Sequence, residues 1–70
     1  MIDEVIYMQV RIFRMFCERS GLDPQSANRL FTRAGAWKFI ADCFDSLHMS
    51  GDELAYEDVT QLLRRRGVTA

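Results

Sequence analysis

The sequence has little of what marks a secreted or metal-stabilised chain. Its 70 residues include two cysteines, one proline, one histidine and one lysine. A disulfide framework in so short a chain normally has about four to eight cysteines, so we expect Cys17 and Cys43 to be reduced, buried thiols. A structural zinc site needs closely spaced cysteine and histidine ligands, which the sequence does not contain. We therefore predict no metal and no other cofactor.

Signals for membrane insertion or export are also lacking. The N-terminus has two acidic residues, Asp3 and Glu4, where a signal peptide needs positive charge. The apolar run from Val5 to Met8 is far too short to span a bilayer. The net charge of −1 and pI near 5.7 do not favour binding to nucleic acid or to an anionic membrane surface. The expectation is a soluble, cytoplasmic protein.

No pattern of residues predicts catalysis. There is no glycine-rich phosphate loop, and a cysteine nucleophile would need a base beside it in a cleft. His48 is expected at the end of a helix, where it would favour the helix dipole and bond terminal carbonyls. Acidic neighbours such as Glu57 and Asp58 are routine in a first helical turn. We predict no enzymatic activity and no catalytic residue.

What the chain does have is apolar content, at 49% of residues with five phenylalanines and one tryptophan. This is enough to fold, although 70 residues lie near the lower size limit of an independent domain. Turn residues divide the chain into segments. Gly21 and Gly35 are typical of positions just after a helix, Asp23 is typical of an N-cap, and Pro24 is typical of a first helical turn. No segment alternates like a strand, although residues 53–55 could be briefly extended. The prediction is one all-α domain over residues 1–70, a compact bundle of four helices at about 2–20, 24–34, 36–48 and 56–66.

The first predicted helix is apolar on too many sides for a surface helix. Its apolar residues within 1–17 number twelve: Met1, Ile2, Val5, Ile6, Tyr7, Met8, Val10, Ile12, Phe13, Met15, Phe16 and Cys17. Most of them spread over an arc of about 220°, whereas a surface helix hides a stripe of a little over ~100°. This helix therefore needs other helices on two sides, or a second chain.

The surplus apolar surface predicts a protein interface. One side of the helix is expected to pack inward: Ile2, Ile6, Phe13 and Cys17. The other side is the candidate partner surface: Met8, Ile12 and Met15. Exposed apolar patches usually mark interfaces, methionine adapts readily to partners, and a homodimer covers such a patch with no other gene product.

The only charge run is Arg64-Arg65-Arg66, near the end of the last predicted helix. It either compensates the helix dipole or contacts an acidic partner surface or phosphate. Eight of the nine basic residues are arginine, the cation enriched at protein interfaces. Arg64, Arg65 and Arg66 are therefore candidate partner-binding residues.

A small helix-turn-helix DNA reader is the alternative. Arg29 and Arg33 give the second predicted helix the positive charge that a recognition helix needs, although this helix is short. The third predicted helix exposes Asp42 and Asp45, which would repel phosphates. Protein binding is therefore preferred to nucleic-acid binding.

The segment from Cys43 to Gly51, followed by Glu57-Asp58-Val59, resembles the small bacterial proteins of domain of unknown function 3791. The upstream Phe31-(x)3-Gly35-(x)4-Ile40 is similar to the middle of that family, and the resemblance covers about residues 5–63. The matching positions are Phe44, Leu47, His48, Gly51, Asp58 and Val59. Met49 departs from the small polar residue usual after Leu-His, which argues against a hydroxyl role there.

This resemblance implies a partner rather than a reaction. The family has no established activity, and its members are often encoded beside a second small family that looks like ADP-ribosyltransferase toxins. An antitoxin-like or regulatory role by direct contact is implied. The sequence thus predicts a non-enzymatic protein–protein interaction module whose partner is itself or a toxin-like neighbour.

Overall fold

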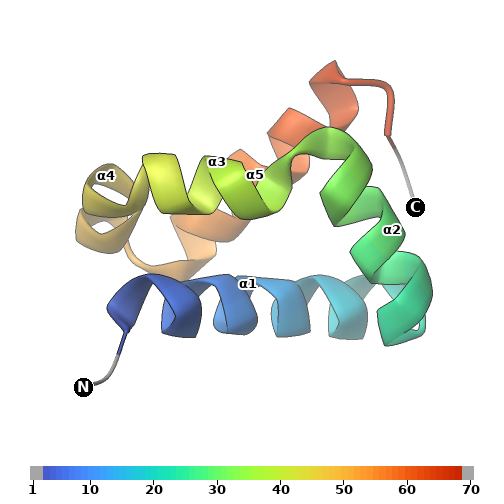
Figure 1. The fold of residues 1–70 in the computed structure, drawn as a ribbon, viewed down its shortest axis with the longest axis horizontal. Helices are drawn as coiled ribbons and strands as arrows, with labels where there is room; N and C mark the ends of the chain where they lie inside the picture. The colour runs from blue at the N-terminus through green and yellow to red at the C-terminus, as the bar shows by residue number, and fades with distance from the viewer. Residues whose placement is uncertain (1–2, 69–70) are drawn as a thin grey trace.

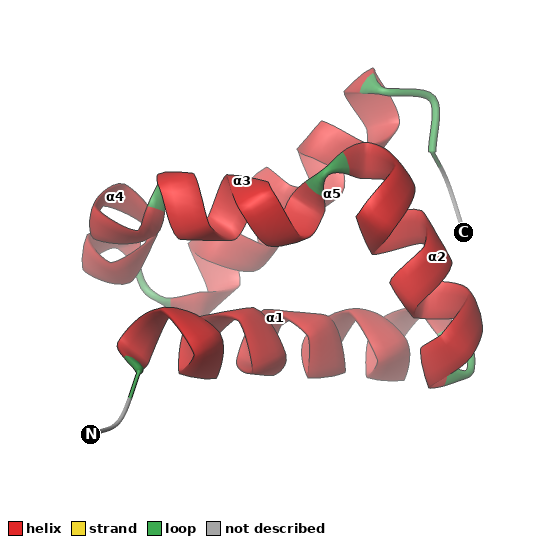
Figure 2. Ribbon diagram, viewed as in Figure 1, coloured by secondary structure: helices red, strands yellow, loops and turns green. Residues whose placement is uncertain are grey.

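A computed structural model describes residues 3–68, which form five α-helices joined by short turns (Figure 1). The helices are α1 (Glu4–Ser20), α2 (Pro24–Ala34), α3 (Ala36–Asp42), α4 (Phe44–Ser50) and α5 (Asp52–Arg65). Figure 2 shows no strand in this part of the chain. The predicted all-α class is confirmed, with five helices in place of four.

Local turn chemistry sets the ends of the first two helices. Asp3 caps the N-terminus of α1, and Gly21 ends that helix in the left-handed conformation at φ +76°. Asp23 then caps α2 by accepting a hydrogen bond from the Ser26 backbone N–H, and Pro24 occupies the first turn. The predicted range of the second helix is confirmed, and residue 2 of the first predicted range lies outside the described residues.

The third predicted helix is two helices that meet at Cys43. This residue has φ −105° and ψ 17°, outside the helical region. Its N–H still donates to the Phe39 carbonyl and its own carbonyl accepts from the Leu47 N–H, both at 2.9 Å. The chain thus bends with little loss of backbone hydrogen bonding, and the bend turns α4 out of the line of α3 (Figure 1).

The last helix begins at Asp52 rather than near residue 56, so the extended stretch expected at 53–55 is wrong. Gly51, at φ +90°, makes the turn that allows this early start. Asp52 and Glu53 then place two carboxylates in the first turn, where they suit the positive end of the helix dipole. Ala55 is fully buried within the helix.

The core lies between α1 and the layer formed by the other helices, each of which contacts α1 (Figure 1). Its largest fully buried side chains are Phe31, Met8, Ile12, Ile40 and Val59. The Phe31 ring is central, with its centroid 5.2 Å from Phe13, 5.1 Å from Phe16 and 5.1 Å from Trp37. These ring contacts connect α1, α2 and α3.

Candidate interaction surfaces

The predicted partner surface on α1 is turned into the core. Met8 is 1% exposed and Ile12 is 0% exposed, and Met15 is half-buried against the same core. The expectation that Met8, Ile12 and Met15 form an exposed patch is therefore wrong. The helices packed on α1 cover this side, and the apolar arc on α1 faces them with Met8 and Ile12 at its centre.

The side of α1 expected to pack inward is the one left partly open. Ile6 is 55% exposed, and Phe13 and Cys17 are only half-buried. Ile2, the fourth residue expected on that side, lies outside the described residues. Phe13 and Cys17 nevertheless pack against the core as expected, so the expectation for this side is wrong at Ile6.

The exposed side of α1 carries a regular row of side chains, here called the α1 seam: Asp3, Tyr7, Val10 and Arg14. Tyr7 is 53% exposed and Val10 is 43% exposed, and Ile6 lies at the edge of the row. The four seam positions follow one another at intervals of four, three and four residues. This spacing keeps them on one face of a helix and is the repeat of a two-helix seam. The spacing is visible in the sequence, but the broad apolar arc conceals it.

The three arginines near the C-terminus have different surroundings. Arg66 donates from Nη1 to the Ala34 carbonyl at 2.8 Å and so satisfies the end of α2. Arg64 and Arg65 are exposed in the last turn of α5, where positive charge suits the helix dipole. Arg64 also lines a hollow in the surface.

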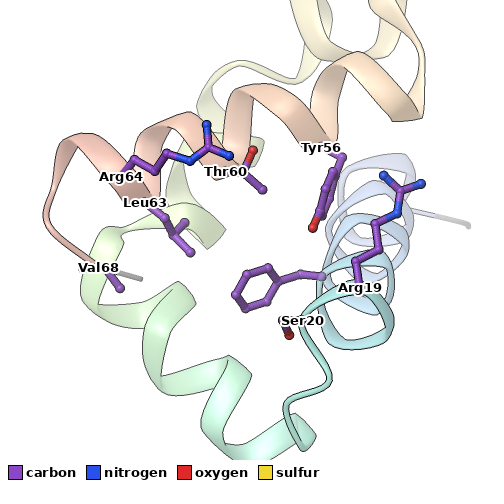
Figure 3. A pocket seen from close by; sticks show the side chains of 8 residues that line it. Arg19, Ser20, Tyr56, Thr60, Leu63, Arg64 and Val68 are labelled. Atoms are coloured by element: carbon purple, nitrogen blue, oxygen red, sulfur yellow. The ribbon is translucent and has the colours of Figure 1, made fainter. Parts of the chain in front are cut away.

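That hollow, here called the α1–α5 pocket, has a volume of about 280 Å³. Phe16 from α1 and Leu63 and Val68 from the C-terminal part of the chain give it an apolar lining. Figure 3 shows the guanidinium-bearing side chains Arg19 and Arg64 on opposite sides of it. Sequence patterning could not find this pocket, because its residues come from separate segments.

Hydroxyl groups and an ion pair complete the α1–α5 pocket. Three hydroxyl-bearing residues, Ser20, Tyr56 and Thr60, are also in the lining. Arg19 is held by the Glu53 carboxylate and lies 4.7 Å over the centroid of the Tyr56 ring. The hydrogen bond to Glu53 raises the pKa of Arg19, and the same bond lowers the pKa of Glu53.

The family-signature residues from the sequence mostly serve the fold. Leu47 and Val59 are buried in the core, Gly51 makes the turn before α5, and Asp58 is exposed. The rings of Phe44 and His48 stack at 5.2 Å with planes 16° apart. His48 lies in the last turn of α4 as expected, but it makes no hydrogen bond to a described residue, so the expected bond to terminal carbonyls is wrong.

Phe44 and His48 also line a second hollow with the start of α1. It has a volume of about 250 Å³ and is completed by Glu4, Tyr7 and Arg11. The Arg11 side chain is already paired, because its Nε donates to an Asp52 carboxylate oxygen at 3.0 Å.

The two cysteines are free thiols and both are half-buried. Burial raises the pKa of the Cys17 thiol, and the nearby Asp23 carboxylate raises it further. Within residues 3–68, no three metal-ligating side chains come together. No helix in the described part of the chain is long and apolar enough to cross a membrane.

The chain belongs to a protein family of unknown function. Residues 8–66 match the family model "Protein of unknown function (DUF3791)", so the resemblance noted in the sequence is confirmed and the chain is a member of that family. The match includes all of α2 to α5 and most of α1. No curated protein and no solved structure matches the chain.

Proposed function

We propose that the protein is a non-enzymatic interaction module that associates with a second copy of itself through the α1 seam. The observation that carries this proposal is the distribution of exposed apolar side chains. Five large apolar residues are exposed among those described, and three of them, Ile6, Tyr7 and Val10, lie together on one flank of α1. Clustered apolar exposure of this kind is typical of an interface.

The seam is complementary to itself when two copies of α1 run antiparallel. Position 3 then faces position 14 of the partner, and position 7 faces position 10. Asp3 would meet the partner's Arg14, and Tyr7 would pack on the partner's Val10. Each contact occurs twice about a two-fold axis, as a closed isologous dimer requires. This charge and shape complementarity favours a second copy over an unrelated partner.

The charged side chains at the two ends of the seam have polar atoms that are available for further hydrogen bonds. Both backbone N–H groups that Asp3 caps, those of Val5 and Ile6, donate to Oδ1, which leaves Oδ2 for a guanidinium. Arg14 makes no ion pair with another described residue. A paired carboxylate and guanidinium at each end would fix the register of the two helices.

A toxin-like neighbour, implied by the family resemblance, would be the other kind of partner for this flank. The apolar flank alone suits either partner, whereas the pairing of Asp3 with Arg14 is specific to a copy of the same helix. We therefore commit to the homodimer.

The first test is the mass of the protein in solution across a concentration series, measured by sedimentation velocity. The wild type is expected to be a dimer, and Tyr7→Glu/Val10→Glu a monomer with unchanged far-ultraviolet circular dichroism. The matched control is Met49→Glu/Leu54→Glu, which adds the same charge at two exposed apolar residues outside the seam. This control should remain a dimer. A monomeric wild type at several hundred micromolar, or a dimeric seam variant, would overturn the proposal.

Asp3→Asn tests the orientation of the two helices. Asparagine caps a helix about as well as aspartate, so this change removes charge without removing the cap. In the antiparallel dimer the variant loses attraction to the partner's Arg14 and should dissociate several-fold more readily at low salt. In a parallel dimer two Asp3 side chains would face each other, and the same change would strengthen association. A strengthened dimer therefore excludes the proposed geometry.

A further inference from the structure

The α1–α5 pocket is separate from the α1 seam and has its own chemistry. Phe16 follows Val10 by six residues, which places it roughly 120° further round the helix. Association through the seam would therefore leave the pocket accessible. The pocket joins an apolar lining to hydroxyl and guanidinium groups, as a site for an amphipathic group does (Figure 3).

The charged side chains that line the pocket are positive, and one of them forms no ion pair with a described residue. No carboxylate is among the described residues that line it. Arg19 is neutralised by Glu53, which stands outside the lining. Arg64 makes no ion pair with a described residue, and Figure 3 shows its side chain extending along the pocket toward Thr60. The available cation at this site is therefore Arg64.

We propose that the α1–α5 pocket binds an acidic peptide segment of a partner protein, through one apolar side chain and a carboxylate beside it. The apolar side chain would contact Phe16, Leu63 and Val68, and the carboxylate would pair with the Arg64 guanidinium. Arginine binds a carboxylate with two parallel N–H donors, which gives direction as well as attraction. This inference goes beyond self-association and does not depend on it.

The size of the pocket favours a single side chain over a free small molecule. Its volume of about 280 Å³ is below the range of about 300–1,000 Å³ in which drug-sized ligands are enclosed. An anchor side chain needs only such a shallow pocket, because the rest of the peptide lies along the surface. The Tyr56 hydroxyl can then donate to the peptide backbone at the rim, and Thr60 Oγ1, whose proton goes to the Glu57 carbonyl, can accept from it.

The test is a titration of the ¹⁵N-labelled protein followed by amide chemical shifts. The probe is the blocked pentapeptide Gly-Asp-Phe-Asp-Gly, and its partner probe replaces both aspartates by asparagine. The acidic peptide is expected to shift the amides of Phe16, Tyr56, Thr60 and Leu63, with affinity that falls as salt rises. The asparagine peptide should bind about three- to tenfold more weakly, because it cannot form the exposed charge-assisted contact with the guanidinium.

Two neighbouring arginines give a matched pair of variants. Arg64→Gln should reduce affinity for the acidic peptide about three- to tenfold and have little effect on binding of the asparagine peptide. Arg65→Gln removes the same charge one residue away from the lining and should change affinity less than about twofold. Equal effects of the two variants, or shifts confined to other residues, would overturn the proposal. Phenylacetate that binds as tightly as the peptide would overturn it too, since the site would then be one for a small carboxylate.

Discussion

Gly35 and Arg66 come together where the end of α2 meets the end of α5. Gly35 has φ +71°, and the Arg66 guanidinium donates to the neighbouring Ala34 carbonyl at 2.8 Å. A Cβ placed on Gly35 would lie 2.9 Å from Nη1 of Arg66. Gly35→Ala is therefore expected to strain the backbone and also to displace the guanidinium that holds the two helix ends together.

The expected cost follows from these two effects. A left-handed conformation costs a residue with a Cβ roughly 1–2 kcal/mol. Loss of the Arg66 hydrogen bond adds about 1 kcal/mol, the value of an ordinary hydrogen bond, because Arg66 is exposed and its charge stays solvated. Gly35→Ala should then destabilise the protein by about 2–3 kcal/mol. Gly21→Ala is the matched control, because Gly21 has φ +76° and a Cβ added there would meet no atom within 4 Å. This substitution should destabilise the protein by only the roughly 1–2 kcal/mol of the backbone effect.

The assay is urea unfolding followed by the fluorescence of Trp37, with the slope checked for constancy across the variants. Arg66→Ala alone should cost about 1 kcal/mol, and the same change made in Gly35→Ala should cost almost nothing more. The expected coupling energy is therefore about 1 kcal/mol. Equal costs for the two glycine substitutions, or additive effects of Gly35→Ala and Arg66→Ala, would refute the reasoning.

Two further predictions concern the cap of α2 and the aromatic core. The hydrogen bonds that the Ser26 hydroxyl and backbone N–H donate to Asp23 lower the pKa of this carboxyl group in the folded protein. The contribution of Asp23 to stability is therefore present above its unfolded pKa of about 3.9 and is lost as pH falls through its folded pKa. Asp23→Ala should thus melt below the wild type at pH 7, with the difference narrowing toward pH 2, and a difference constant over that range would contradict this. Phe31→Leu removes a fully buried ring from contact with Trp37 and should cost about 1–2 kcal/mol with a shift in tryptophan emission, measured by the same urea titration. An unchanged midpoint would show that the ring is not central to the core.

The helix ends that depend on neighbouring residues could be predicted from the sequence. Gly21, Asp23, Pro24 and Gly35 act through their own backbone preferences and short hydrogen bonds, so their effect is local. The bend at Cys43 has no such signal, because the residue is neither glycine nor proline and the backbone hydrogen bonds around it persist. Beyond the bend α4 contacts α1, which is distant in sequence, and such contacts leave no local signal.

The early start of α5 depends on contacts with α1 that are distant in sequence. Asp52 pairs with Arg11 and Glu53 with Arg19, and these partners are 41 and 34 residues apart in the chain. By local preference alone, the acidic residues after Gly51 suit a loop as well as a first helical turn. A helical start there becomes favourable once the first turn faces two arginines on the neighbouring helix.

The same two ion pairs show which part of the α1 surface faces α5. Arg11 and Arg19 are eight residues apart and both point to the first turn of α5, so the surface of α1 between them faces that helix. Met8 and Ile12 on this surface are buried, and Met15 is half-buried. Hydrophobicity alone could not distinguish the two sides, since both are apolar. The two arginines pair beside the covered side, whereas Ile6, Tyr7 and Val10 on the other side stay exposed.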